Sequence, residues 1–145
     1  MNEVSWLLQT LDYVGIALFA VTGALAASRK QLDIVAFAFF AGVTAIGGGT
    51  LRDVLLDIPV FWVRNPAYLG IPLGVAVLVY FSAHLLESRY RVLLWADAAG
   101  LAAYSVVGAA KTLAAGAGAA DALAFGMLTA TFGGVIRDVL AGEPS

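Results

Sequence analysis

The sequence predicts an all-α fold: a polytopic membrane helical bundle with inverted three-helix repeats, whose second and fifth helices are kinked at glycine motifs. Three observations lead to this prediction. Of the 145 residues, 61% are hydrophobic and 12% are charged, against roughly 45–50% and 25% in soluble domains. Five apolar runs are long enough to cross a bilayer as helices. The sequence also matches itself when it is shifted by 85 residues.

Each of the five expected spans contains about 20 mostly apolar residues, the length that a transmembrane helix requires. The first is read as a retained span, because no positive charge precedes it as in a secretory signal. The second and fifth spans carry the glycine motifs, and the fourth has Asp97 early and Lys111 late. The expected spans are residues 11–28, 33–56, 67–87, 92–113 and 119–141, within a single membrane domain of residues 1–145.

The internal repeat extends without a gap from Asp12–Pro59 onto Asp97–Pro144, and 16 of these 48 positions are identical. A period of three helices is odd, so the two copies cross the membrane in opposite directions. Such inverted repeats are typical of transport proteins. Repeat one covers about residues 11–87. Repeat two covers about residues 92–145, and we expect it to end before its third helix.

Paired glycines at matching places in the two repeats predict an interrupted helix in each. They lie at Gly47–Gly49 and Gly133–Gly134, and each glycine lowers helix propensity by about 1 kcal/mol. A bend there would free main-chain carbonyls that could coordinate a cation. The alternative is that the small residues only allow close packing of helices.

An arginine and an aspartate follow each glycine motif inside the span: Arg52-Asp53 and Arg137-Asp138. Charges in the bilayer usually face water or a partner. The side chains of neighbouring residues in a helix point about 100° apart. We therefore expect the arginine and the aspartate of each pair to need separate partners. Asp12 is the expected ion-pair partner of Arg52, and by the repeat Asp97 is that of Arg137. Pore-lining and purely structural roles both remain open for these residues.

Other protein classes are disfavoured. Net charge is -2 and cysteine is absent, with one histidine, so nucleic-acid binding, thiol chemistry and a resident metal or cofactor are not expected. No phosphate-binding loop, zinc spacing or nucleophile elbow occurs, so we do not expect an enzyme. We expect a multi-pass protein of the plasma (inner) membrane, and the arginines and lysines in the short loops predict that its N-terminus is non-cytoplasmic.

The doubled motif Gly-Gly-Gly-Thr-Leu-Arg-Asp (47–53) and Phe-Gly-Gly-Val-Ile-Arg-Asp (132–138) resembles the prokaryotic branch of the trimeric intracellular cation (TRIC) channels. The resemblance implies a seven-helix subunit in a homotrimer within membrane lipids, with one pore for potassium and sodium through each subunit. It also implies that the second and fifth helices line this pore, and that Lys111 takes part in gating. The same family domain is also described as a glycine transporter.

Two transport functions follow as hypotheses, beside a third in which the chain is a structural membrane subunit whose repeats serve only packing. The first is a monovalent cation channel, in which carbonyls, hydroxyls and carboxylates replace the hydration shell of potassium or sodium. The alternative is a carrier of a small, glycine-like amino acid that uses the same repeat-related site. The residues expected along the path are Thr44, Gly47, Gly48, Gly49, Thr50, Arg52, Asp53, Thr129, Gly133, Gly134, Arg137 and Asp138, with Asp12 and Asp97 as structural ion-pair candidates.

Overall fold

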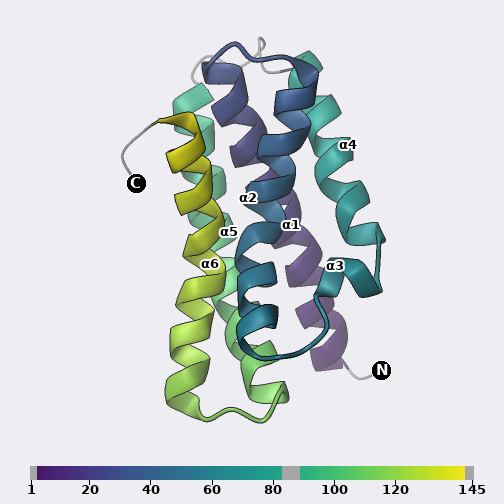
Figure 1. The fold of residues 1–145 in the computed structure, drawn as a ribbon, viewed down its shortest axis with the longest axis vertical. Helices are drawn as coiled ribbons and strands as arrows, with labels where there is room; N and C mark the ends of the chain where they lie inside the picture. The colour runs from purple at the N-terminus through teal and green to yellow at the C-terminus, as the bar shows by residue number, and fades with distance from the viewer. Residues whose placement is uncertain (1–2, 83–88, 143–145) are drawn as a thin grey trace.

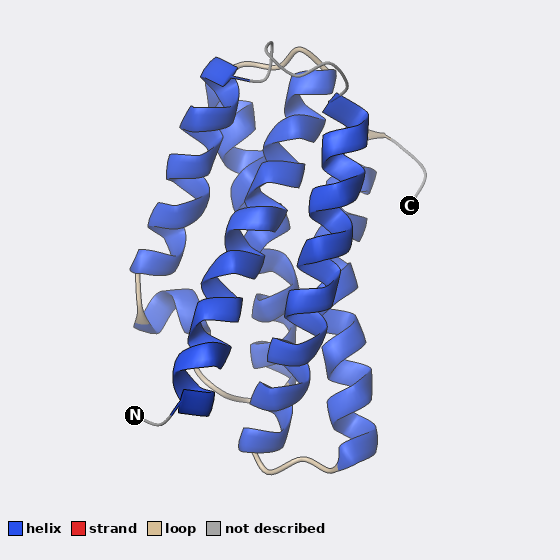
Figure 2. Cartoon of the chain, turned by 180° about the vertical axis from the view of Figure 1, so that it is seen from behind, coloured by secondary structure: helices blue, strands red, loops and turns tan. Residues whose placement is uncertain are grey.

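The computed structural model describes residues 3–82 and 89–142, and within these ranges every regular element is a helix (Figure 2). The helices form one elongated bundle, with long helices running along its length (Figure 1). Their bounds are α1 Glu3–Arg29, α2 Ile34–Leu55, α3 Phe61–Arg64, α4 Ala67–Ser82, α5 Arg89–Ala114 and α6 Ala119–Ala141. The all-α prediction is confirmed.

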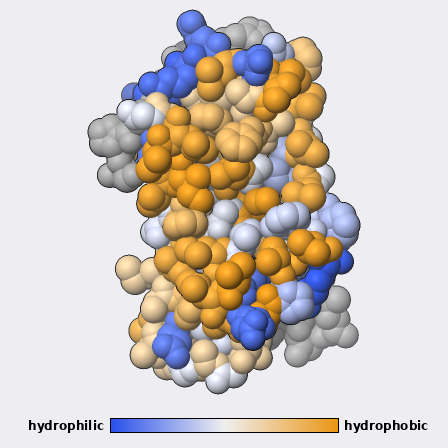
Figure 3. Space-filling view, in the orientation of Figure 1, coloured by the Kyte–Doolittle hydropathy of each residue, from blue (hydrophilic) through white to orange (hydrophobic). Residues whose placement is uncertain are grey.

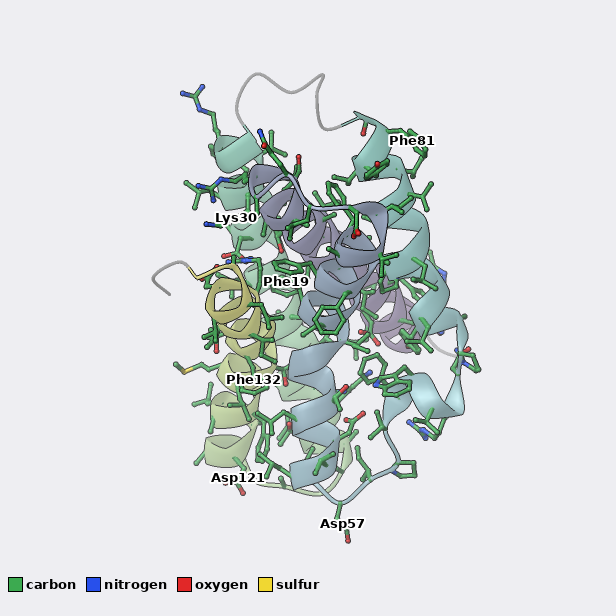
Figure 4. All side chains as sticks on the ribbon, turned by 45° about the horizontal axis from the view of Figure 1, so that its top comes forward. Phe19, Lys30, Asp57, Phe81, Asp121 and Phe132 are labelled. Atoms are coloured by element: carbon green, nitrogen blue, oxygen red, sulfur yellow. The ribbon has the colours of Figure 1, made fainter. Side chains whose placement is uncertain are left out.

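Four of these helices, α1, α2, α5 and α6, are long and apolar enough to cross a membrane, and α4 is a shorter apolar helix. Apolar residues cover much of the visible surface between more hydrophilic residues near the two ends (Figure 3). Asp57 and Asp121 lie at one end of the bundle, and Lys30 and Phe81 lie at the other (Figure 4). This pattern is that of a protein whose middle faces lipid.

The expected spans agree with the helices, with differences at their ends. The fifth span matches α6 residue for residue, whereas α1 begins eight residues before the predicted 11–28. Residues 83–87 of the third expected span lie outside the described residues. The short helix α3 was not expected. It belongs to the segment between the second and third spans, which the repeat does not duplicate within this chain.

The inverted threading that the odd period predicts is visible in the arrangement of the helices. Helices α1 and α5 run in opposite directions along the bundle, and so do α2 and α6 (Figure 1). Helix α4 packs against α1 and α2. As a result, 61% of the apolar window of α1 is buried, against 33% for the equivalent window of α5. The extent of the two repeats as domains stays a prediction.

Local chemistry defines where α2 begins and where α6 ends. Asp33 caps α2, because its Oδ1 accepts a hydrogen bond from the amide of Ala36 at 2.9 Å, which satisfies one free amide of the first turn. Gly142 ends α6 in the left-handed region at φ 73°, a conformation that glycine adopts without strain.

Candidate functional site

The two glycine motifs meet where α2 and α6 pack against each other. A Cβ at Gly48 would lie 2.1 Å from the carbonyl oxygen of Thr129, and a Cβ at Gly133 would lie 2.1 Å from that of Thr44. These contacts exchange under the 85-residue shift, so the pseudo-two-fold axis of the repeat passes through the crossing. Glycine is required here because each helix approaches the main chain of the other.

Helical structure continues through both motifs, from Ile34 to Leu55 and from Ala119 to Ala141. The expected interruption with free main-chain carbonyls is therefore wrong in this conformation. The physical reason is the close packing just described, because the partner helix replaces the missing side chains. A bend within the continuous helices stays a prediction.

A second reciprocal contact closes the centre of the bundle between α1 and α5. The ring of Tyr104 lies over Gly15, where a Cβ would be 2.7 Å from its Cδ1, and the ring of Phe19 lies over Gly100, where a Cβ would be 3.1 Å from its Cε1. The two rings, which are repeat equivalents, are buried with centroids 5.4 Å apart. Figure 4 labels Phe19 between the helices. These two buried rings fill the space between α1 and α5 at this level.

The Arg52–Asp53 pair is sealed inside the bundle. Arg52 Nε donates to Asp53 Oδ1 at 2.8 Å, and both side chains are 2% exposed. The expectation that sequence neighbours cannot pair is wrong here, because the long arginine side chain folds back across the 100° between them. The other carboxylate oxygen, Asp53 Oδ2, accepts from the amide of Phe61 at 3.0 Å.

Asp12 pairs with Lys111 instead of Arg52, so the predicted Asp12–Arg52 ion pair is wrong. Lys111 Nζ lies 2.9 Å from Asp12 Oδ2, and the hydroxyl of Tyr68 donates to the same oxygen at 3.0 Å. The ammonium also lies over two aromatic rings, 5.3 Å from the centroid of Phe61 and 5.9 Å from that of Tyr68. Such contacts stabilise a cation by about 0.5–2 kcal/mol each.

A cavity of about 430 Å³ opens beside this ion pair. Lys111 is 33% exposed there, whereas Asp12 is almost completely covered. The cavity therefore presents a positive charge in front of a buried carboxylate. Its lining residues are Leu8, Gln9, Asp12, Phe61, Arg64, Asn65, Tyr68, Val107, Ala110, Lys111 and Ala114.

The equivalent cluster of repeat two has more exposed carboxylates and a different pairing. Arg137 Nη1 lies 3.0 Å from Asp97 Oδ1, the ion pair that the repeat predicts, and Arg137 Nε lies 2.9 Å from Asp138 Oδ1. The carboxylates of Asp97 and Asp138 are 23% and 19% exposed. Arg137 thus forms ion pairs with two partly exposed carboxylates.

The hydroxyls of the three predicted threonines have different surroundings. The hydroxyl of Thr129 donates to the carbonyl of Phe125 at 2.6 Å. Thr50 Oγ1 accepts from the indole of Trp62 at 2.9 Å, beside an apolar cavity of about 390 Å³ that Gly47 also lines. Thr44 Oγ1 is buried without a hydrogen-bond partner among the described residues.

Sequence reasoning missed the aromatic residues that complete the first cluster. Phe61 and Tyr68 stack edge to face at 4.9 Å, and Tyr13 stacks on Tyr68 at 5.2 Å. Phe61 and Tyr68 fall in or just after the connection between α2 and α4, so the repeat gave no signal for them. The Trp-Val-Arg-Asn-Pro run at 62–66, which is polar for a membrane chain, was the available indication of a structured connection.

An inverted-repeat helical bundle with ionisable residues buried among its helices is the architecture of membrane transport proteins. The model of the family described as "Glycine transporter" matches residues 9–84 and 94–145. A structure described as that of the TRIC trimeric intracellular cation channel orthologue from Rhodobacter sphaeroides is 52% identical, with a TM-score of 0.93, over 95% of this chain and 72% of that one. The chain belongs to this family of prokaryotic TRIC proteins, as its sequence motifs predict.

Other relatives agree with this assignment. A prokaryotic TRIC channel crystallised in 0.5 M KCl has a TM-score of 0.90 at 29% identity, over 96% of this chain and 72% of that one. The UPF0126 inner membrane protein YadS of Escherichia coli K12 is 40% identical over 138 residues, and a UPF0126 membrane protein of Vibrio cholerae is 41% identical over 143. This chain covers 92% and 94% of its own length in these matches, but only 65% and 58% of theirs.

Proposed function

We propose that this chain forms the conducting core of a cation channel, and that the described conformation is closed at its centre. The observation that carries the proposal is the pair of repeat-related charged clusters, one built around Asp12 and the other around Asp97. Because the repeats are inverted, the clusters lie on opposite sides of the central crossings. Carboxylates at both mouths would attract cations and repel anions.

Lys111 is the proposed gate of the mouth that contains the larger cavity. Its ammonium neutralises Asp12 at 2.9 Å and is itself partly exposed to the cavity, so an approaching cation meets a positive charge first. Movement of the lysine away from the ion pair would leave Asp12 as an unpaired carboxylate facing the cavity. Replacement of Lys111 by methionine should therefore raise the open probability.

We also propose that the channel selects potassium and sodium over chloride. The second mouth has two partly exposed carboxylates, Asp97 and Asp138, which both pair with Arg137. These exposed carboxylates favour cations at that mouth. The homotrimer is proposed from the Rhodobacter neighbour, which is described as trimeric, and mass measurement of the detergent-solubilised protein tests it.

Planar-bilayer recording of the reconstituted chain under asymmetric potassium chloride tests the channel proposal. We expect unitary currents that reverse near the potassium equilibrium potential, and a reversal potential closer to zero when Asp97 and Asp138 are both changed to asparagine. Gly42→Ala is a suitable control, since no atom lies within 4 Å of the added methyl group. Absence of unitary currents together with saturable solute exchange would overturn the proposal.

A carrier of a small zwitterion is the second candidate. It is favoured by the family description "Glycine transporter" and by the first cavity, which places an ammonium and a carboxylate side by side. Those two groups could bind the carboxylate and the amine of an amino acid. Counterflow of labelled glycine in liposomes distinguishes the candidates, because preloaded glycine accelerates uptake by a carrier and not by a channel.

A further inference from the structure

The two Arg–Asp pairs are equivalent in sequence but differ in their surroundings. The side chains of Arg52 and Asp53 are each 2% exposed. In the second pair Asp138 is 19% exposed, and Arg137 also binds Asp97. A residue that contacts a permeating ion must be reachable from water, and in this conformation only the second pair meets that condition.

The first pair, Arg52–Asp53, has a different role: it binds main-chain groups of the connection between α2 and α4. The carbonyl of Asp53 accepts from the amide of Ile58 at 3.1 Å, and its Oδ2 accepts from the amide of Phe61 at 3.0 Å. Arg52 occupies the remaining carboxylate oxygen at 2.8 Å. Hydrogen bonds to a charged acceptor are about twice as strong as neutral ones, so this carboxylate fixes where α3 begins.

The position of Phe61 explains why the connection matters for the neighbouring ion pair. Its buried ring packs against Gly49, where a Cβ would lie 2.6 Å from Cε1 of the ring. The guanidinium of Arg52 lies 5.8 Å from the centroid of this ring, and the ammonium of Lys111 lies 5.3 Å from it. The ring therefore contacts both the guanidinium of the sealed pair and the ammonium of the Asp12–Lys111 pair.

From this geometry we infer that Arg52 and Asp53 are positioning residues, which anchor α3 so that the Phe61 ring supports Lys111 on Asp12. The three consecutive glycines then have three separate surroundings. Gly47 lines the apolar cavity, Gly48 admits the main chain of α6, and Gly49 admits the Phe61 ring. The inference revises the pore-lining role expected for Arg52 and Asp53. Its consequence for gating rests on the proposed function, whereas the anchoring itself does not.

Hydrogen exchange of residues 58–64 measures the anchoring directly, without ion conduction. The double variant Arg52→Met/Asp53→Leu removes both charges together, so that neither is left buried alone. We expect the amide of Phe61 to exchange about tenfold or more faster, because it loses a charged acceptor. The repeat-matched variant Arg137→Met/Asp138→Leu should leave this segment unchanged. Equal exchange in the wild type and the first variant would overturn the inference.

Gly49→Ala provides a second route to the same result if the double variant fails to fold. The added methyl group would displace the Phe61 ring without altering any charge, and Gly42→Ala is its control in the same helix. We expect faster exchange of residues 58–64 in Gly49→Ala only. Protection of the segment as in the wild type would contradict the inference.

Bilayer recordings of the same variants separate the inference from the channel proposal. We expect Arg52→Met/Asp53→Leu to change open probability while its reversal potential stays that of the wild type. The repeat-matched variant should shift the reversal potential instead. A similar shift in both would show that Arg52 and Asp53 meet ions and would overturn their positioning role. If the Arg52→Met/Asp53→Leu variant exchanges faster but the wild type carries no current, the anchoring role is supported and the channel proposal is refuted.

Discussion

Gly48 should be the least replaceable of the three consecutive glycines, because main chain rather than side chain faces it. In Gly48→Ala the new Cβ would lie 2.1 Å from the carbonyl oxygen of Thr129. Carbon–oxygen contacts between helices are about 3.3–3.6 Å, so α2 and α6 must separate locally by about 1 Å. Overpacking of this kind costs about 1–3 kcal/mol, and sometimes more.

The helix propensity of alanine works in the opposite direction and offsets at most about 1 kcal/mol. The net loss expected for Gly48→Ala is therefore about 1–2 kcal/mol. Gly49→Ala should cost less, because its obstacle is an aromatic side chain, and Gly47→Ala least, because its nearest neighbour is the terminal methyl of Ile136 at 3.0 Å. Gly42→Ala, with open space around it, should be neutral or stabilising.

Thermal unfolding in detergent, followed by size-exclusion chromatography, provides the comparison. We expect Gly48→Ala to lose the most thermal stability, Gly49→Ala less and Gly47→Ala least. Gly42→Ala should be as stable as the wild type or more stable. If instead the three consecutive glycines were needed for flexibility, the three alanine variants would behave alike. Equal stability of Gly48→Ala and Gly42→Ala would refute the packing argument.

Three further substitutions test individual contacts by the same unfolding assay. Gly15→Ala should destabilise by about 1–3 kcal/mol through overpacking against the buried Tyr104 ring, because the new Cβ would lie 2.7 Å from that ring. An unchanged midpoint would contradict the close packing of the ring on Gly15. Trp62→Phe should cost about 1 kcal/mol by removing the indole hydrogen bond to Thr50, and the loss should vanish in a Thr50→Val background. Asp12→Asn should cost about 1–2 kcal/mol by breaking a half-buried ion pair; a stability gain would argue against that pair.

The sequence was sufficient for the helices and their inverted order, because apolar run length and an odd repeat period are strong signals in a membrane chain. It also predicted the Asp97–Arg137 ion pair correctly. It failed for Asp12, whose partner Lys111 lies 99 positions away and has alanine as its repeat counterpart. A repeat predicts contacts that both copies share, and it cannot predict those that one copy gained alone.

The packing at the centre of the bundle limits which helices can separate to open a path. At the α2–α6 crossing the helices touch through main chain at Gly48 and Gly133, so widening it would require whole helices to move apart. At the α1–α5 crossing the obstacle is the pair of rings from Phe19 and Tyr104. A side chain changes rotamer at far less cost than a packed helix shifts. A path on the α1–α5 side, between the two charged clusters, is therefore the one that this packing favours.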